Sequence, residues 1–147
     1  MDCGKYAIEW RICKKDGIFP SKILDTGLAS HLCGLSTPEA LAQSPLKGAF
    51  VETYAPGEIF KSYIHNGIVP ELHFARTNAG EEIDLIIEED GKVYPVEIKS
   101  ATTPRASMSR NFSLVEGARR AQGTVLTLGG KPGALPGGVR VLPISSV

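Results

Sequence analysis

Apolar residues recur at three- and four-residue spacing between positions 48 and 63, and this periodicity predicts an amphipathic helix. Pro56 and Gly57 lie inside the segment. Because proline removes a backbone donor and crowds the preceding turn, we expect a kink or a break there. Two shorter helices are predicted upstream: one covers residues 25–32, and the other starts at Thr37 as N-cap, with proline next, and runs to about residue 43.

Strand patterns follow the long helix. Residues 71–76 and 92–99 alternate between apolar and polar side chains, and residues 82–88 are rich in isoleucine. Downstream, the pattern predicts a helix over 111–122, a buried strand over 124–128, a Gly/Pro-rich loop over 129–138 and a last strand over 139–144. The order of elements is helix, three strands, helix, strand, strand, and it predicts an α/β fold. We divide the chain into an N-terminal helical or connecting segment (1–46) and a main domain (47–147).

The Asp90-Gly91 pair between the second and third strand patterns is the strongest short-range signal for a two-residue hairpin turn. Such a turn pairs Glu89 with Lys92 and fixes the register of both strands. Carried back, this register places Asp84 opposite Glu97 and Glu82 opposite Lys99 on one face. The other face receives Ile83, Leu85, Ile87, Tyr94, Val96 and Ile98.

Two carboxylates directly opposite each other repel, so we expect something to compensate Asp84 and Glu97. Mg²⁺ is bound through one or two carboxylates together with waters and phosphate oxygens, and Mn²⁺ accepts similar ligands. Lys99 lies on the same face and would point a cation at a phosphate or at its attacking water. The alternative is a solvated sheet face with an ordinary ion pair between Glu82 and Lys99.

Length and composition restrict the class of protein. The 147 residues suit one globular domain, and 42% hydrophobic against 22% charged residues predicts a folded chain. No apolar run reaches the roughly 20 residues that span a bilayer, and the first residues do not resemble a secretion signal, so we expect a cytoplasmic protein. Cys3, Cys13 and Cys33 are widely spaced and predict neither disulfides nor a zinc site.

Charge is distributed unevenly although its sum is zero. Residues 81–97 carry a net charge of −6, and residues 99–147 carry +6. Basic side chains beside an acidic metal site could hold a nucleic-acid backbone. Besides Lys99, the candidates for this role are Arg105, Arg110, Arg119, Arg120 and Lys131. For Arg119 and Arg120, a merely solvated basic helix face is an equal alternative.

Five segments in this order resemble the C-terminal domain of unknown function attached to prokaryotic AAA-type ATPases. They are residues 20–28, 48–54, 58–63, 82–85 and 96–99. The resemblance extends from about Phe19 to the C-terminus. It departs at Pro56-Gly57, where family members continue the first helix. The ATPase half is missing, because the sequence contains no Gly-x-x-x-x-Gly-Lys-Ser/Thr phosphate loop.

That domain is similar to the PD-(D/E)xK, or restriction-endonuclease-like, nucleases. The resemblance implies an α/β fold with a mixed sheet flanked by helices and an αβββαβ core. It also implies that Asp84, Glu97 and Lys99 are the metal-binding and catalytic residues. Glu52 matches an additional acidic residue that Holliday-junction-resolvase-like members place on the first helix, and it would complete the metal shell. An exposed helix carboxylate without a role is the alternative for Glu52.

Two functions follow from these expectations. One is Mg²⁺- or Mn²⁺-dependent hydrolysis of DNA phosphodiesters. The other is a catalytically inactive module that binds DNA or protein and regulates an ATPase, since folds of this kind host unrelated functions.

Overall fold

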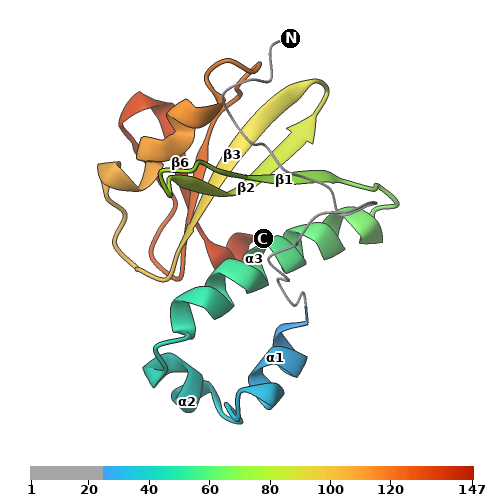
Figure 1. The fold of residues 1–147 in the computed structure, drawn as a ribbon, viewed down its shortest axis with the longest axis vertical. Helices are drawn as coiled ribbons and strands as arrows, with labels where there is room; N and C mark the ends of the chain where they lie inside the picture. The colour runs from blue at the N-terminus through green and yellow to red at the C-terminus, as the bar shows by residue number, and fades with distance from the viewer. Residues whose placement is uncertain (1–24) are drawn as a thin grey trace.

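A computed structural model describes residues 25–147, which form a six-stranded mixed sheet with helices on its two faces (Figure 1). The expectations for Cys3, Cys13 and the first part of the 20–28 segment lie outside the described residues. The elements are α1 (Thr26–Leu32), α2 (Pro38–Gln43), α3 (Lys47–His65), β1 (Glu71–Arg76), β2 (Glu82–Glu89), β3 (Lys92–Lys99), the 3₁₀ helix η1 (Ala106–Val115), β4 (Thr124–Thr127), β5 (Gly133–Leu135), the 3₁₀ turn η2 (Pro136–Gly138), β6 (Val139–Pro143) and the 3₁₀ turn η3 (Ile144–Ser146).

α2 begins directly after Thr37, the predicted N-cap, and α1 begins directly after Asp25, which caps it in the structure. The side chain of Asp25 accepts a hydrogen bond from the backbone of Leu28 at 2.9 Å, and Thr37 Oγ1 accepts one from Ala40 at 3.2 Å. Neither α1 nor α2 contains a buried residue. They lie beyond the N-terminal end of α3 (Figure 1).

The long helix α3 continues through Pro56, so of the two expected alternatives, a kink or a break, the break is wrong. A proline inside a helix costs about 3 kcal/mol. Val51, Ala55 and Ile59 on the same helix are buried against the sheet. Burial of each large aliphatic side chain contributes about 1.5 to 3 kcal/mol, which is enough to keep the helix continuous. Within residues 25–147, no helix combines the length and apolar content needed to cross a membrane.

The sheet has the strand order β1-β2-β3-β4-β6-β5. β1, β2 and β3 pair antiparallel, β3 pairs parallel with β4 and β4 with β6, and β5 is an antiparallel edge strand. The β2–β3 turn has positive φ at both Asp90 and Gly91, as the predicted two-residue hairpin requires. The sequence pattern did not indicate β5, which lies inside the predicted 129–138 loop.

Two apolar cores lie on opposite faces of the sheet. α3 covers one of them, in which its buried side chains meet Leu85, Val96 and Ile98. The other contains Phe112 and Val115 of η1.

The helix predicted over residues 111–122 is wrong. The 3₁₀ helix η1 ends at Val115. Arg119 and Ala121, which lie in the second half of the predicted helix, instead form backbone hydrogen bonds with Val93 of β3.

Candidate functional site

The register of β2 against β1 changes near Asp84. His73 pairs with Ile86, and the next registered pair is Ala75 with Ile83, so β2 uses one more residue than β1 over this stretch. Such an irregularity turns the following side chains to the other face. Ile83 therefore packs with Ile86, whereas simple alternation placed it with Leu85.

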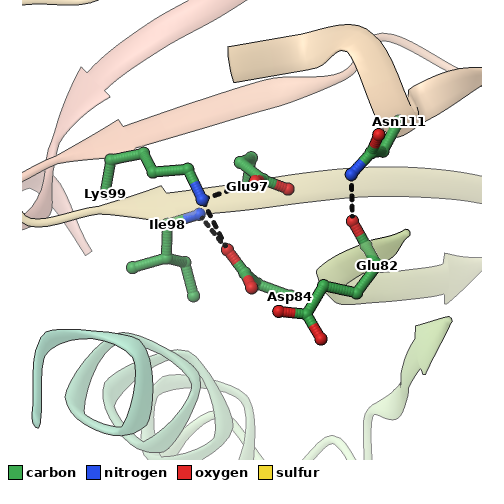
Figure 2. Close-up of polar contacts among 6 residues, drawn as sticks. All are labelled: Glu82, Asp84, Glu97, Ile98, Lys99 and Asn111. Atoms are coloured by element: carbon green, nitrogen blue, oxygen red, sulfur yellow. Dashed lines mark hydrogen bonds and ion pairs between the residues drawn. The ribbon is translucent and has the colours of Figure 1, made fainter. Parts of the chain in front are cut away.

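Beside this irregularity, the ladder between β2 and β3 changes from backbone to side-chain bonding. The registered pairs run from Glu89–Lys92 to Leu85–Val96 and match the predicted register. Beyond them, the backbone N–H of Ile98 donates to Asp84 Oδ2 at 2.8 Å (Figure 2). Asp84 is only 8% exposed, so this bond holds a buried carboxylate against β3.

Lys99 joins the two predicted carboxylates. Its Nζ lies 2.6 Å from Glu97 Oε1 and 3.8 Å from Asp84 Oδ2 (Figure 2). Glu97 is 5% exposed. The structure thus brings together Asp84, Glu97 and Lys99, as the hairpin register predicts. We call this end of the β2–β3 pair the open end and the end with the Asp90-Gly91 turn the hairpin end.

The electrostatics of the open end are dominated by burial and by the neighbouring charges. Burial and then the charge of Asp84 raise the pKa of Glu97 from 4.5 to about 7, against the opposing effect of Lys99. For Lys99, burial alone would lower the pKa. The hydrogen bond to Glu97 and the negative charges of Asp84, Glu97 and Glu52 outweigh burial, so the pKa of Lys99 is raised.

The donor set at the open end fits a divalent cation. Glu97 Oε2 is buried and has no hydrogen-bond partner among the described residues. A buried oxygen of this kind is costly unless something binds it. Carboxylate oxygens are the protein ligands that Mg²⁺ and Mn²⁺ prefer. Asp84 and Glu97 are therefore suited to hold such an ion.

The two other acidic residues near the site are Glu52 and Glu82. α3 holds Glu52 partly buried, and its charge acts on Lys99, so the structure brings it within electrostatic range of the site. Glu82 was expected opposite Lys99, but its ion pair is with Arg76 of β1, at 3.9 Å. The Glu82 charge still contributes to the raised pKa of Glu97.

The predicted basic residues lie at different ends of the sheet. Arg105 follows β3 and precedes η1, and Lys131 follows β4, whose Thr127 pairs with Lys99. Both therefore lie on loops that start from the open end. Arg119 and Arg120 instead flank Val93 near the hairpin end, where the Arg119 carbonyl accepts from Val93 N–H at 3.1 Å. At about 3.3 Å per residue, Val93 is roughly 20 Å along β3 from Lys99.

Two of the predicted basic residues have particular neighbours. Arg110 is exposed on η1, next to Asn111, which reaches β2. Arg120 forms an ion pair with Glu116 at 3.7 Å and donates to the Phe112 carbonyl at 3.4 Å. These contacts give Arg120 a structural role at the hairpin end.

Sequence reasoning missed Asn111. Its Nδ2 donates to the Glu82 carbonyl at 2.9 Å and links η1 to β2 beside the site (Figure 2). The two residues are 29 positions apart, so no local motif marks the contact. The apolar residues Phe112 and Val115, both buried, are the sequence signal that η1 packs on the sheet.

The fold and the site define an α/β domain with a buried carboxylate pair and a lysine at the end of a mixed sheet. Residues 47–147 match the family described as Domain of unknown function (DUF4143), and the chain belongs to this family.

Two curated relatives are also similar to the chain. They are the uncharacterized proteins Mb2031c of Mycobacterium bovis and Rv2008c of Mycobacterium tuberculosis, each 34% identical over 94 residues. The match covers 64% of this chain and 20% of each relative, so the chain spans about a fifth of the relatives' length. No solved structure matches the chain.

Proposed function

We propose that this protein is a metal-dependent nuclease of the PD-(D/E)xK type that hydrolyses DNA phosphodiesters with Mg²⁺ or Mn²⁺. The observation that carries the proposal is the buried Glu97 carboxylate, whose Oε2 has no hydrogen-bond partner within residues 25–147 while Asp84 and Lys99 lie beside it. The alternative interpretation of these charges is a solvated sheet face. It does not account for the burial of both carboxylates, each of which is less than 10% exposed.

Asp84 and Glu97 would hold the ion, with Glu52 completing its ligand set from α3. The bound ion would supply positive charge for the phosphate oxygens and acidify a water molecule. Lys99 would donate from Nζ to a phosphate oxygen or position the attacking water, since its ammonium group already lies between the two carboxylates. The bond from Ile98 to Asp84 Oδ2 would fix the direction of that carboxylate.

The DNA backbone would follow the basic residues at the open end. Arg105, Arg110 and Lys131 are exposed there and are the proposed phosphate contacts. Arg119 and Arg120 would contribute little to this path, because they lie near Val93 at the hairpin end.

The second candidate is a catalytically inactive module that binds DNA or protein and regulates an ATPase. The observation that favours it is the apolar surface of α1, where Leu28 is 49% and Leu32 68% exposed. Leu28 and Leu32 are four residues apart and therefore share one face of the helix, and contiguous apolar surface of this kind marks protein contacts when it is extensive. In such a module, Asp84 and Glu97 would be retained from a catalytic ancestor without taking part in catalysis.

The two functions are separated by titrating Mn²⁺ into the wild type and Asp84→Asn by calorimetry and then incubating both with linear and branched DNA. Asn keeps an oxygen that can accept the Ile98 N–H but removes the charge, so it is a sharper test than Asp84→Ala. Lys99→Ala tests the lysine, and Glu88→Gln at the hairpin end is the matched control.

The nuclease function predicts cleavage by the wild type and Glu88→Gln, and no cleavage by folded Asp84→Asn, Asp84→Ala or Lys99→Ala. Equal cleavage by any of these three variants would overturn the proposed roles. A folded wild type that binds no Mn²⁺ and cleaves no DNA would favour the binding module.

A further inference from the structure

The Asn111 side chain connects η1 to β2, two elements that are distant in the sequence. Its Nδ2 donates to the backbone carbonyl of Glu82, 29 residues earlier, at 2.9 Å (Figure 2). Asn111 is partly buried and directly precedes Phe112, which is 2% exposed and anchors η1 in the core. The amide group is thus held against β2 by a fixed neighbour.

Glu82 lies in the part of β2 where backbone pairing with β3 has given way to side-chain bonding. Registered pairs of β2 and β3 extend to Leu85–Val96. Beyond that pair, the Asp84 carboxylate binds the Ile98 N–H from one side. The Asn111 amide binds the Glu82 carbonyl two residues before Asp84. Two side-chain contacts therefore hold β2 in the conformation that presents Asp84 to Lys99.

We propose that Asn111 is a positioning residue that fixes the Asp84 carboxylate at the cation site, an inference that rests on the function proposed above. Without the Nδ2 donor, the Glu82 carbonyl loses its hydrogen bond to η1, and the segment from Glu82 to Asp84 can shift toward a regular ladder. In a regular antiparallel ladder, the Ile98 N–H bonds to a backbone carbonyl of β2, which displaces the Asp84 carboxylate. Asn111 opposes this shift.

Outer-shell partners of metal ligands typically change metal affinity by about 10- to 100-fold. We expect Asn111→Ala to weaken Mn²⁺ binding about tenfold, at the lower end of this range, because Asn111 acts on the backbone two residues from the ligand. Asn111→Asp has the same shape but cannot donate to the Glu82 carbonyl. Its added negative charge would favour a cation, so weaker binding in this variant would show that the donor matters.

The experiment combines two readouts on the full chain: Mn²⁺ affinity by calorimetry and, without metal, amide hydrogen exchange at Ile98. We expect exchange at Ile98 to become about fivefold faster in both variants, as loss of one hydrogen bond predicts. Amides at the hairpin end of the ladder should not change. Ser113→Ala is the matched control, because the hydrogen bond that Ser113 Oγ donates is local, to the Arg110 carbonyl at 3.2 Å on the same helix.

Three results would overturn the inference. Mn²⁺ affinities of both Asn111 variants within twofold of the wild type would overturn it alone and leave the proposed function standing. If exchange became faster by the same factor at Ile98 and at the hairpin-end amides of the β2–β3 ladder, Asn111 would have a general stabilising role and not a positioning role. A wild type that binds no Mn²⁺ would overturn the proposed function together with the metal-positioning role.

Discussion

The two ends of the β2–β3 pair carry similar groups in different surroundings. At the hairpin end, Glu71, His73 and Glu88 bring potential ligand atoms within 4.8 Å of one another. The Glu88 side chain there is 41% exposed and pairs with His73 Nε2 at 3.2 Å. At the open end, Asp84 and Glu97 are buried beside Lys99.

The comparison shows that burial, more than the spacing of carboxylates, distinguishes the candidate site. Water can hydrate the exposed carboxylates at the hairpin end, and a surface ion pair contributes about 1 kcal/mol or less. At the open end, Glu97 lacks such hydration, and its Oε2 has no partner among the described residues. A bound cation would therefore offset a larger desolvation cost at the open end.

The largest expected effect is on cation affinity. Glu97→Gln should weaken Mn²⁺ binding about 100-fold, because it removes a charged ligand and the buried oxygen left without a partner. Glu88→Gln makes the same chemical change at the hairpin end and should alter the affinity less than twofold. Calorimetric titration of both variants measures the difference. A loss of Mn²⁺ affinity in Glu88→Gln but not in Glu97→Gln would move the cation to the hairpin end and reverse the comparison.

The second effect is on stability as a function of pH. Without metal, the pKa of Glu97 is about 7 in the folded protein, above its ordinary 4.5. Between these values the folded state binds more protons than the unfolded state, so the free energy of unfolding falls as pH rises through this window. Allowing for solvent screening, we expect a loss of about 2 kcal/mol.

Urea denaturation of the wild type and Glu97→Gln between pH 4.5 and 8, in EDTA, measures this loss. The variant should lack the decrease, and Glu88→Gln should keep it. Parallel curves for the wild type and Glu97→Gln would show that the Glu97 carboxylate is not desolvated as the structure indicates.

The third effect concerns the basic residues near each end. Arg105→Gln with Lys131→Gln should weaken DNA binding about tenfold and reduce the slope of log affinity against log salt by about 2, because two phosphate contacts are lost. Arg119→Gln with Arg120→Gln should change the slope little. Anisotropy titrations over about 50 to 200 mM salt measure both pairs in an Asp84→Asn background, which prevents cleavage. Equal changes would mean that DNA follows both ends.

The hairpin shows how far the sequence predicts the site. The Asp90-Gly91 turn fixes a register that the structure confirms for five pairs, from Glu89–Lys92 to Leu85–Val96. That register is sufficient to bring Asp84 near Glu97 and Lys99. A tight turn acts locally, so its consequences can be followed residue by residue along both strands.

Features that depend on distant segments were not predictable in this way. The side to which Ile83 turns depends on how β2 pairs with β1, which shifts register between His73 and Ala75. The Asn111 contact depends on how η1 packs across the sheet. The continuity of α3 through Pro56 depends on burial against that sheet. In each case, tertiary packing overrides the local pattern.

The smallest expected effect is on the free energy of unfolding, and it tests whether the hairpin turn affects folding without affecting Mn²⁺ binding at the open end. Gly91 has φ +67°, which costs a residue with a Cβ about 1 kcal/mol, so Gly91→Ala should lower the free energy of unfolding by about that amount. Gly117→Ala is the control, because a Cβ there meets nothing within 4 Å and no positive φ strains it. Urea denaturation measures both variants, and calorimetry with Mn²⁺ should show unchanged affinity in each. A weaker Mn²⁺ affinity in Gly91→Ala would mean that the turn sets the geometry of Asp84 and Glu97 from the far end of the strands. Unchanged Mn²⁺ affinity would mean that the geometry of Asp84 and Glu97 is set at the open end itself, by the contacts of Ile98 and Asn111.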